Sequence, residues 1–289
     1  MKTLFVDCSM GAAGDMLTAA LLEIVCRADE GAADNARIDK AKMAGFVERF
    51  NEIGIPGVEM KVAEDEKQGI TGTHVHIYVN GEEEQEPGEH EHHHHDHDHE
   101  HDHEHHHHHH DHEHEHHHHH HSMADIEALV GALSIDEEVK ADVMNVYKLI
   151  AAAESKVHGK PVSEVHFHEV GTMDAVADVT AVCMLIHEIA PEQIIATPVA
   201  TGSGSVRCAH GILPVPAPAT ANILQGIPAY SGDIKGELCT PTGAALIKYF
   251  VNKYSQMPPM CTEAIGYGLG TKDFPKANCL RVFYGESVD

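Results

Sequence analysis

The chain has 289 residues, enough for one large or two modest domains, and its 46 acidic against 19 basic residues give a formal net charge of −27. Such a balance argues against nucleic acid and anionic lipid membranes as partners, because both attract Lys and Arg, and it favours metal cations. No apolar run is long enough to cross a bilayer, and Asp7 and Asp15 interrupt any signal peptide. The sequence therefore predicts a cytoplasmic protein.

The first part of the chain carries a strand, two helices and a hairpin. We expect a strand at residues 3–7, a turn at 10–14, helices at 15–27 and 39–51, and strands at 58–63 and 73–79 joined by a polar turn at 64–69. The hairpin leads into a tract, residues 81–121, that alternates acids with histidines and has no apolar residue apart from Pro87. Such a segment cannot bury a core, so we expect it to be disordered.

The part after the tract mixes helices and strands. We expect helices at 123–131, 136–158 and 172–189, strand-like runs at 193–199 and 206–213, helices at 216–225 and 241–251, and strands at 262–268 and 279–284. The predicted fold class is α+β or α/β, with mixed sheets and packed helices. Residues 1–80 form the N-terminal part of the core, 81–121 a metal-binding loop, and 122–289 the remainder of the core.

The seven cysteines are an odd number, are widely spaced and form no Cys-x-x-Cys pair. Neither a disulfide framework nor a zinc ribbon fits this pattern. We therefore expect reduced thiols, most of them buried as small apolar residues.

The tract is a metal-binding segment. Seven of the 30 histidines lie outside it, so 23 lie inside. Neutral imidazole binds Ni, Cu, Zn and Co, and affinity alone does not select one of them. An expression tag would be a short pure run near a terminus, whereas this tract is long, internal and interleaved with carboxylates, which suits storage and hand-off of a metal. Its candidate ligands are His92, His93, His94, His95, His105, His106, His107, His108, His116, His117, His118 and His119.

A second candidate site lies in residues 164–178. If its first part is extended, His166 and His168 project to one face, and Thr172 can cap a helix that places Asp174 and Asp178 one turn apart. An alternative is purely structural, with a carboxylate favoured by the helix dipole and hydrogen-bonded histidines. The predicted catalytic residues are His166, His168, Glu169 and Asp174, and the predicted metal ligands here are His166, His168 and Asp178.

Residues 201–211 form a loop of small residues that also carries a cation, a thiol and an imidazole. Its glycines allow close backbone approach to a ligand, and Arg207 could hold a phosphate or carboxylate in a bidentate fork. Cys208 and His210 are candidate metal ligands. A plain surface hairpin explains the glycines equally well.

Two strand-to-helix turns, residues 7–15 and 237–243, could seat anions, because helix N-termini offer free N–H groups and Pro241 is a good first helical residue. Each pattern is also that of a simple tight turn. The first turn lacks the Walker lysine and the full dinucleotide fingerprint. The candidate cofactor-binding residues in these turns are Gly11, Gly14, Asp15, Thr240 and Thr242.

Five segments carry a family resemblance: residues 6–16, 164–171, 208–219, 240–245 and 266–271. With them the chain resembles the nickel insertion proteins of the LarC family. The resemblance implies a CTP-dependent nickel chelatase that inserts Ni(II) into pyridinium-3,5-bisthiocarboxylic acid mononucleotide. The product is the nickel-pincer cofactor used by lactate racemase and related enzymes, so the precursor and a recipient enzyme are the implied partners.

Members of this family usually continue into a C-terminal domain associated with CTP binding, whereas this sequence stops at Asp289. We expect that domain to be encoded separately or reached by ribosomal frameshifting. Two other classes stay open: a non-enzymatic nickel storage protein or metallochaperone, which needs only the tract, and a metal-dependent hydrolase. The sequence is also compatible with a homo-oligomer.

Overall fold

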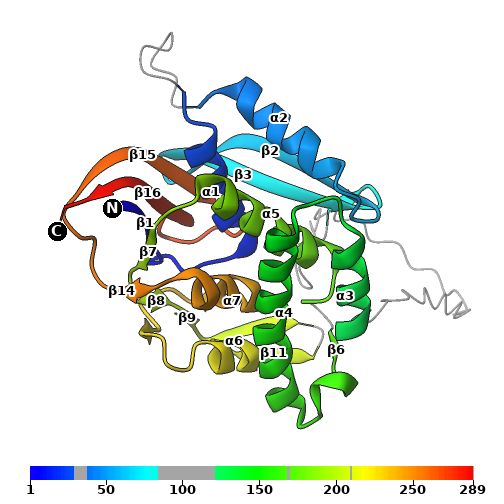
Figure 1. Ribbon diagram of the computed structural model, residues 1–289. Helices are drawn as coiled ribbons and strands as arrows, with labels where there is room; N and C mark the ends of the chain where they lie inside the picture. The colour runs from blue at the N-terminus through cyan, green and yellow to red at the C-terminus, as the bar shows by residue number, and fades with distance from the viewer. Residues whose placement is uncertain (29–37, 84–120, 168–169, 209, 289) are drawn as a thin grey trace, which may run out of the picture.

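The computed structural model describes residues 1–28, 38–83, 121–167, 170–208 and 210–288. Within them, an eight-stranded sheet with parallel and antiparallel pairs is combined with packed helices (Figure 1). The fold is therefore α/β, which confirms the predicted fold class. None of the helices in these ranges is both long and apolar enough to span a bilayer.

The sheet places the first and last strands of the chain side by side at its centre. Its order is β14 (Lys253–Tyr254), β7 (Gln193–Ala196), β1 (Lys2–Asp7), β16 (Cys279–Ser287), β15 (Met260–Leu269), β3 (Ile70–Val79) and β2 (Val58–Lys67), and β4 (Glu82–Glu83) also pairs with β3. β1 runs parallel to β7 and antiparallel to β16. Its carboxyl end therefore lies beside that of β7.

The helices pack in layers against this sheet. They are α1 (Gly14–Val25), α2 (Lys40–Asn51), α3 (Met123–Ala132), α4 (Glu137–His158), α5 (Met173–Ile189), α6 (Pro218–Ile223) and α7 (Pro241–Phe250). α1 contacts β3, β15 and β16 on one side and α5 on the other. α4 contacts α3, α5, α6 and α7, so it forms an outer layer (Figure 1). One large apolar core joins residues from both sides of the tract.

Short strand pairs organise the loops around this core. They are β5 (His121–Ser122) with β6 (His166–Phe167), β8 (Val199–Ala200) with β12 (Ala229–Tyr230), β9 (Gly202–Ser203) with β13 (Gly236–Glu237), and β10 (Ser205–Cys208) with β11 (Gly211–Pro214). The 3-10 turn η2 (Val162–Glu164) precedes β6.

Most predicted elements are confirmed, and five boundaries are corrected. The segment 81–121 was expected to be disordered throughout, but its ends form part of β4 and β5, because they pair with β3 and β6. The run expected at 193–199 is divided between β7 and β8. The polar turn expected at 64–69 is only Gln68–Gly69, both with positive φ, because the polar flanks continue the strands as an exposed edge hairpin. The run at 206–213 is the β10–β11 hairpin and not one strand. The helix expected at 216–225 begins at Pro218, since a residue that precedes proline disfavours helical backbone.

Candidate functional site

Two turns interlock at the carboxyl end of β1. The turn that follows β1 is linked to the segment before α7: the Ala12 N–H donates to the Leu238 carbonyl at 3.0 Å, and the Thr240 N–H donates to the Ala12 carbonyl at 3.1 Å. A third segment joins them, because the Leu238 N–H donates to the Thr201 carbonyl at 3.1 Å. Ligands of α/β proteins commonly bind at the carboxyl ends of parallel strands, so this is where we expect a site.

Glycines permit the two turns to approach closely. Gly11 has φ +84°, and a Cβ added there would lie 1.8 Å from the Leu238 carbonyl oxygen. A Cβ at Gly243 would lie 2.0 Å from the Ala12 carbonyl oxygen. Protein atoms, and not a ligand, occupy the space beside these glycines. The backbone contact thus explains Gly11 without a cofactor, as the tight-turn alternative proposed.

The hydroxyl groups predicted to bind an anion have partners within the helix end. Thr240 is the N-cap of α7, and its Oγ1 accepts a hydrogen bond from the Gly243 N–H at 3.2 Å. Thr240 Oγ1 also lies 3.0 Å from Thr242 Oγ1. This capping stabilises the helix, and the assignment of both threonines to a ligand stays a prediction.

Three carboxylates, Asp15, Asp174 and Asp178, form what we call the acidic cluster. A Cβ added to Gly14 would lie 2.5 Å from Asp178 Oδ2, so α1 and α5 touch at this point. Burial, and then the negative charges of Asp15 and Asp174, raise the pKa of Asp178 well above its ordinary value, although the Asp15 backbone N–H donates to its carboxylate. The predicted spacing of Asp174 and Asp178 on one helix side is confirmed.

Two shielded oxygen atoms near the acidic cluster lack partners. Asp178 Oδ1 and the hydroxyl of the fully buried Tyr147 on α4 have no hydrogen bond within the described part of the chain. Burial and the charges of Asp174 and Asp178 raise the pKa of Tyr147. Buried polar atoms are usually paired, so these two oxygens make the acidic cluster a place where a polar ligand could bind. Sequence reasoning missed Tyr147, whose helical position among apolar residues resembles a core residue.

Thr172 behaves differently from the prediction. It is the N-cap residue of α5, but its hydroxyl makes no side-chain cap and instead donates to Asp174 Oδ1. A hydrogen bond from the hydroxyl to a charged carboxylate is stronger than a hydrogen bond between the hydroxyl and a neutral backbone N–H group. Thr172 therefore orients Asp174 and does not cap the helix.

The β10–β11 hairpin brings His210 to the end of α4. The His210 and His158 ring centroids lie 5.1 Å apart, and His158 Nε2 lies 3.4 Å from Glu154 Oε2. Arg207 is exposed and Cys208 is half-buried on the same hairpin. Sequence reasoning missed Glu154 and His158, which are spaced i, i+4 in the last turn of a predicted helix.

Each end of the histidine tract forms a short strand that pairs with a histidine-containing strand: β4 pairs with β3, and β5 pairs with β6. On β6, His166 is paired in register with Ser122 of β5, directly after the tract. His168, Glu169 and the twelve candidate histidines of the tract lie outside the described residues, so their predicted convergence stays untested. Within the described ranges, no group of three or more His, Cys, Asp or Glu side chains is assembled to hold a metal ion.

Cys8 and the ion pair of Asp7 with Arg281, at the start of the first turn, stabilise the fold. Cys8 is fully buried, and burial, with the nearby Cys239 and Asp7, raises its pKa well above the ordinary value. Burial alone would raise the pKa of Asp7, but hydrogen bonds from Ser9 and Arg281 hold it below its ordinary value. Arg281 thus places a guanidinium at the carboxyl end of β1, and sequence reasoning missed this residue.

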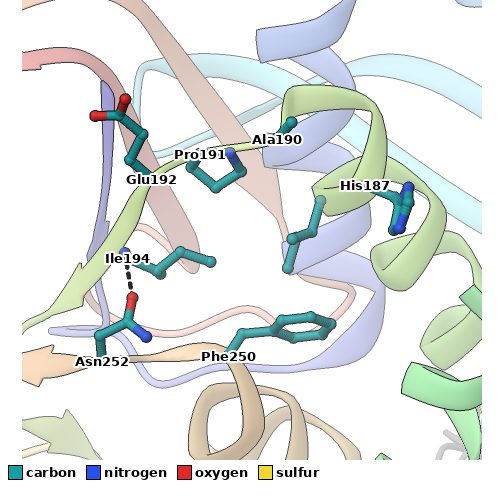
Figure 2. A pocket seen from close by; sticks show the side chains of 8 residues that line it. His187, Ala190, Pro191, Glu192, Ile194, Phe250 and Asn252 are labelled. Atoms are coloured by element: carbon teal, nitrogen blue, oxygen red, sulfur yellow. Dashed lines mark hydrogen bonds between the residues drawn. The ribbon is translucent and has the colours of Figure 1, made fainter. Parts of the chain in front are cut away.

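A pocket of about 320 Å³ lies at the opposite end of α5 (Figure 2). Its imidazole and its carboxylate, His187 and Glu192, lie on opposite sides, and Asn252 accepts a hydrogen bond from the Ile194 N–H at 2.8 Å. These groups do not converge on a common point, so the pocket is a weaker candidate than the acidic cluster. Its lining residues are Ile186, His187, Ala190, Pro191, Glu192, Ile194, Phe250 and Asn252.

The described residues form an α/β core with carboxylates and imidazoles at helix ends, and the sequence adds a tract that contains 23 histidines. Imidazole and carboxylate are ligand types that transition-metal cations accept, so the class of protein that these features suggest is one that handles such a cation. Comparison with known proteins identifies the family. The family model for nickel insertion proteins matches residues 4–289, so the chain belongs to the nickel insertion protein family.

Several relatives carry the name pyridinium-3,5-bisthiocarboxylic acid mononucleotide nickel insertion protein, among them the following three. The chain is 38% identical to that of Geobacillus kaustophilus, with 100% of this chain and 61% of the relative covered. It is 39% identical to that of Clostridium acetobutylicum (99% and 64% covered) and 35% identical to that of Clostridium kluyveri (99% and 62% covered). The chain thus spans about three-fifths of the length of these relatives. No solved structure matches it.

Proposed function

We propose that this chain acts as a nickel chelatase that inserts Ni(II) into pyridinium-3,5-bisthiocarboxylic acid mononucleotide. The observation that supports this most strongly is the family match over residues 4–289, because it contains every segment that meets at the candidate site. Nickel is then the cargo and the mononucleotide is the acceptor.

The acidic cluster suits the chemistry of this acceptor. When Ni(II) binds to a pyridinium carbon, the carbon–hydrogen bond breaks, its electron pair forms the nickel–carbon bond, and the proton needs a base. A carboxylate whose pKa is raised above its ordinary value is a stronger base than an ordinary carboxylate, and therefore a more effective general base. We assign Asp178 to accept the proton, with Asp174 held beside it by Thr172. The sulfur atoms of the acceptor supply the remaining new bonds to nickel.

The phosphate of the acceptor suits the N-terminus of α7 better than that of α1. The first turn of α7 has no acidic residue, whereas that of α1 has Asp15. Free N–H groups at a helix N-terminus bind phosphate, and a nearby carboxylate would repel it. We therefore propose Thr240 and Thr242 as phosphate contacts, with Arg207 as a cation on the neighbouring hairpin.

CTP, together with a divalent cation, is the nucleotide that the family resemblance adds to this proposal. We propose that CTP acts through the part of the relatives that this chain does not span, and that the finished cofactor passes to a recipient nickel-pincer enzyme such as a lactate racemase. We place the reaction in the cytoplasm. None of the seven cysteines, all of which lie in the described ranges, forms a disulfide, which supports a reducing compartment.

The test is mass spectrometry of the precursor after incubation with the chain, Ni(II) and CTP, with and without the C-terminal part of a relative. We expect a product that has gained nickel and lost hydrogen. A deletion of residues 84–120 should lower the nickel stoichiometry yet preserve insertion at high nickel. A storage protein would instead bind nickel and form no product in any arm.

Variants assign the residues. Asp178→Asn should abolish or strongly slow insertion while the protein stays folded, because an amide cannot accept the proton. His158→Ala should slow insertion, and His187→Ala, which alters an imidazole in the pocket at the other end of α5, is the matched control. Equal insertion rates for the wild type and Asp178→Asn would contradict the role of the acidic cluster.

A further inference from the structure

Two histidines outside the candidate site share one face of the sheet. His74 and His76 lie on β3, and their ring centroids are 4.2 Å apart with an angle of 41° between the rings. The alternate residue Thr73 points to the other face, where its hydroxyl donates to Glu23 of α1 at 2.7 Å. Because side chains alternate along a strand, both imidazoles face away from α1.

Each imidazole has a carboxylate beside the same ring nitrogen. His76 Nδ1 lies 2.6 Å from Glu83 Oε1, and His74 Nδ1 lies 3.7 Å from Asp65 Oδ2. The Nε2 atom of His74 is 3.3 Å from the Thr271 hydroxyl, a neutral and exchangeable partner. A metal-binding histidine commonly donates one ring N–H to a carboxylate and offers the other nitrogen to the metal.

We propose that the Nε2 atoms of His74 and His76 bind a divalent first-row transition metal, forming a two-histidine half-site. With metal–nitrogen bonds of about 2.1 Å, two imidazoles bound at about 90° to each other, as in square-planar or octahedral coordination, have ring centroids about 4.6 Å apart. The observed 4.2 Å is close to this value. The inference deepens the proposed function, on which its choice of nickel rests.

The half-site lies where the histidine tract begins. Its carboxylate Glu83 belongs to β4, which pairs with β3 through Tyr78 and Val79, and it is the third residue of the tract and the last one described before residue 121. Two lysines lie near the pair, and each has a carboxylate partner: Lys67 is 2.7 Å from Asp273, and Lys61, in register with His76, is 3.3 Å from Glu59. Carboxylates thus outweigh positive charge around the imidazoles, which favours a divalent cation.

Two protein ligands make a site suited to exchange and not to storage. Across the described residues no third His, Cys, Asp or Glu joins the pair to complete a metal site, so the other coordination positions stay open to water or an incoming ligand. His76 is the more accessible histidine of the pair, with 25% of its side chain exposed, whereas His74 is buried. A metal released by the tract could be held here briefly before it moves on.

The experiment is histidine modification by diethyl pyrocarbonate in the full chain, with and without saturating Ni(II). Cleavage after glutamate releases peptide 67–82, whose only histidines are His74 and His76, and peptide 170–188, whose only histidine is His187. We expect nickel to reduce modification of the first peptide several-fold and to leave the second unchanged. Mg(II), which prefers oxygen ligands, should protect neither.

Variants separate this site from the tract. Glu83→Gln should weaken the nickel protection of peptide 67–82, because the carboxylate that polarises His76 is lost, and His187→Ala should leave it unchanged. At limiting nickel, His76→Ala should slow insertion, and excess nickel should restore the rate. Equal nickel protection in peptides 67–82 and 170–188 would overturn the half-site. Product formed despite that result would leave the chelatase proposal intact.

Discussion

Replacement of Gly14 by alanine tests the contact between α1 and the acidic cluster. The added Cβ would lie 2.5 Å from Asp178 Oδ2 and 2.6 Å from Asp178 Cβ. The second atom is fixed to the backbone of α5, so a rotamer change alone cannot remove the clash. Overpacking of this kind costs about 1–3 kcal/mol of unfolding free energy. At about 2–4 °C per kcal/mol for a protein of this size, Tm should fall by about 2–12 °C.

A matched control isolates the steric effect. Gly45 lies inside α2, and nothing lies within 4 Å of an added Cβ, so Gly45→Ala should gain about 1 kcal/mol from helix propensity. Urea unfolding followed by circular dichroism at 222 nm measures both variants. Opposite signs for the two substitutions are expected. A Gly14→Ala variant as stable as the wild type, beside a stabilised Gly45→Ala variant, would refute the close approach of α1 to Asp178.

Three further predictions concern charge, thiols and turns. Because the pKa of Asp178 is raised in the folded state, the unfolding free energy should fall as pH rises above about 4. The Asp178→Asn variant should not show this fall. A urea midpoint of the wild type that stays constant from acid to alkaline pH would contradict the prediction. Exposed Cys261 should react with an aromatic disulfide reagent in the native protein, whereas Cys239, whose pKa burial raises to about 12, should react only on unfolding. Gly11 and Gly204 have φ of +84° and +87°, but only Gly11 is crowded, so its alanine variant should lose about 1–3 kcal/mol more in the same urea assay.

Local signals predicted most of the elements. Asp39 was expected at the start of a helix, and its carboxylate accepts from the Ala41 and Lys42 N–H groups at 2.9 and 3.1 Å. Pro241 was expected as a first helical residue and starts α7. Caps and turn residues act over a few positions, so their effect can be read without knowledge of the fold.

The features that could not be predicted from the sequence depend on contacts between residues that are far apart in the chain. The 5.1 Å approach of His158 to His210 joins a helix end to a hairpin turn 52 positions away, and no periodicity in either segment encodes it. The crowding of Gly11 by Leu238 is likewise set by the order of the strands. The acidic cluster was predicted in part, because Asp174 and Asp178 belong to one helix, whereas the addition of Tyr147 from α4 required the packed structure.

The central position of β16 has a consequence for synthesis of the protein. β16 lies between β1 and β15, and the register pairs Lys2 with Glu286 and Asp7 with Arg281, so the middle of the sheet joins residues more than 270 positions apart. Such long-range pairing slows folding, because distant segments must meet before they stabilise each other. A nascent chain on the ribosome would carry its complete histidine segment long before the sheet could close. Chaperones that shield β1 in the meantime would then matter more for this protein than for one whose first strand pairs with the next.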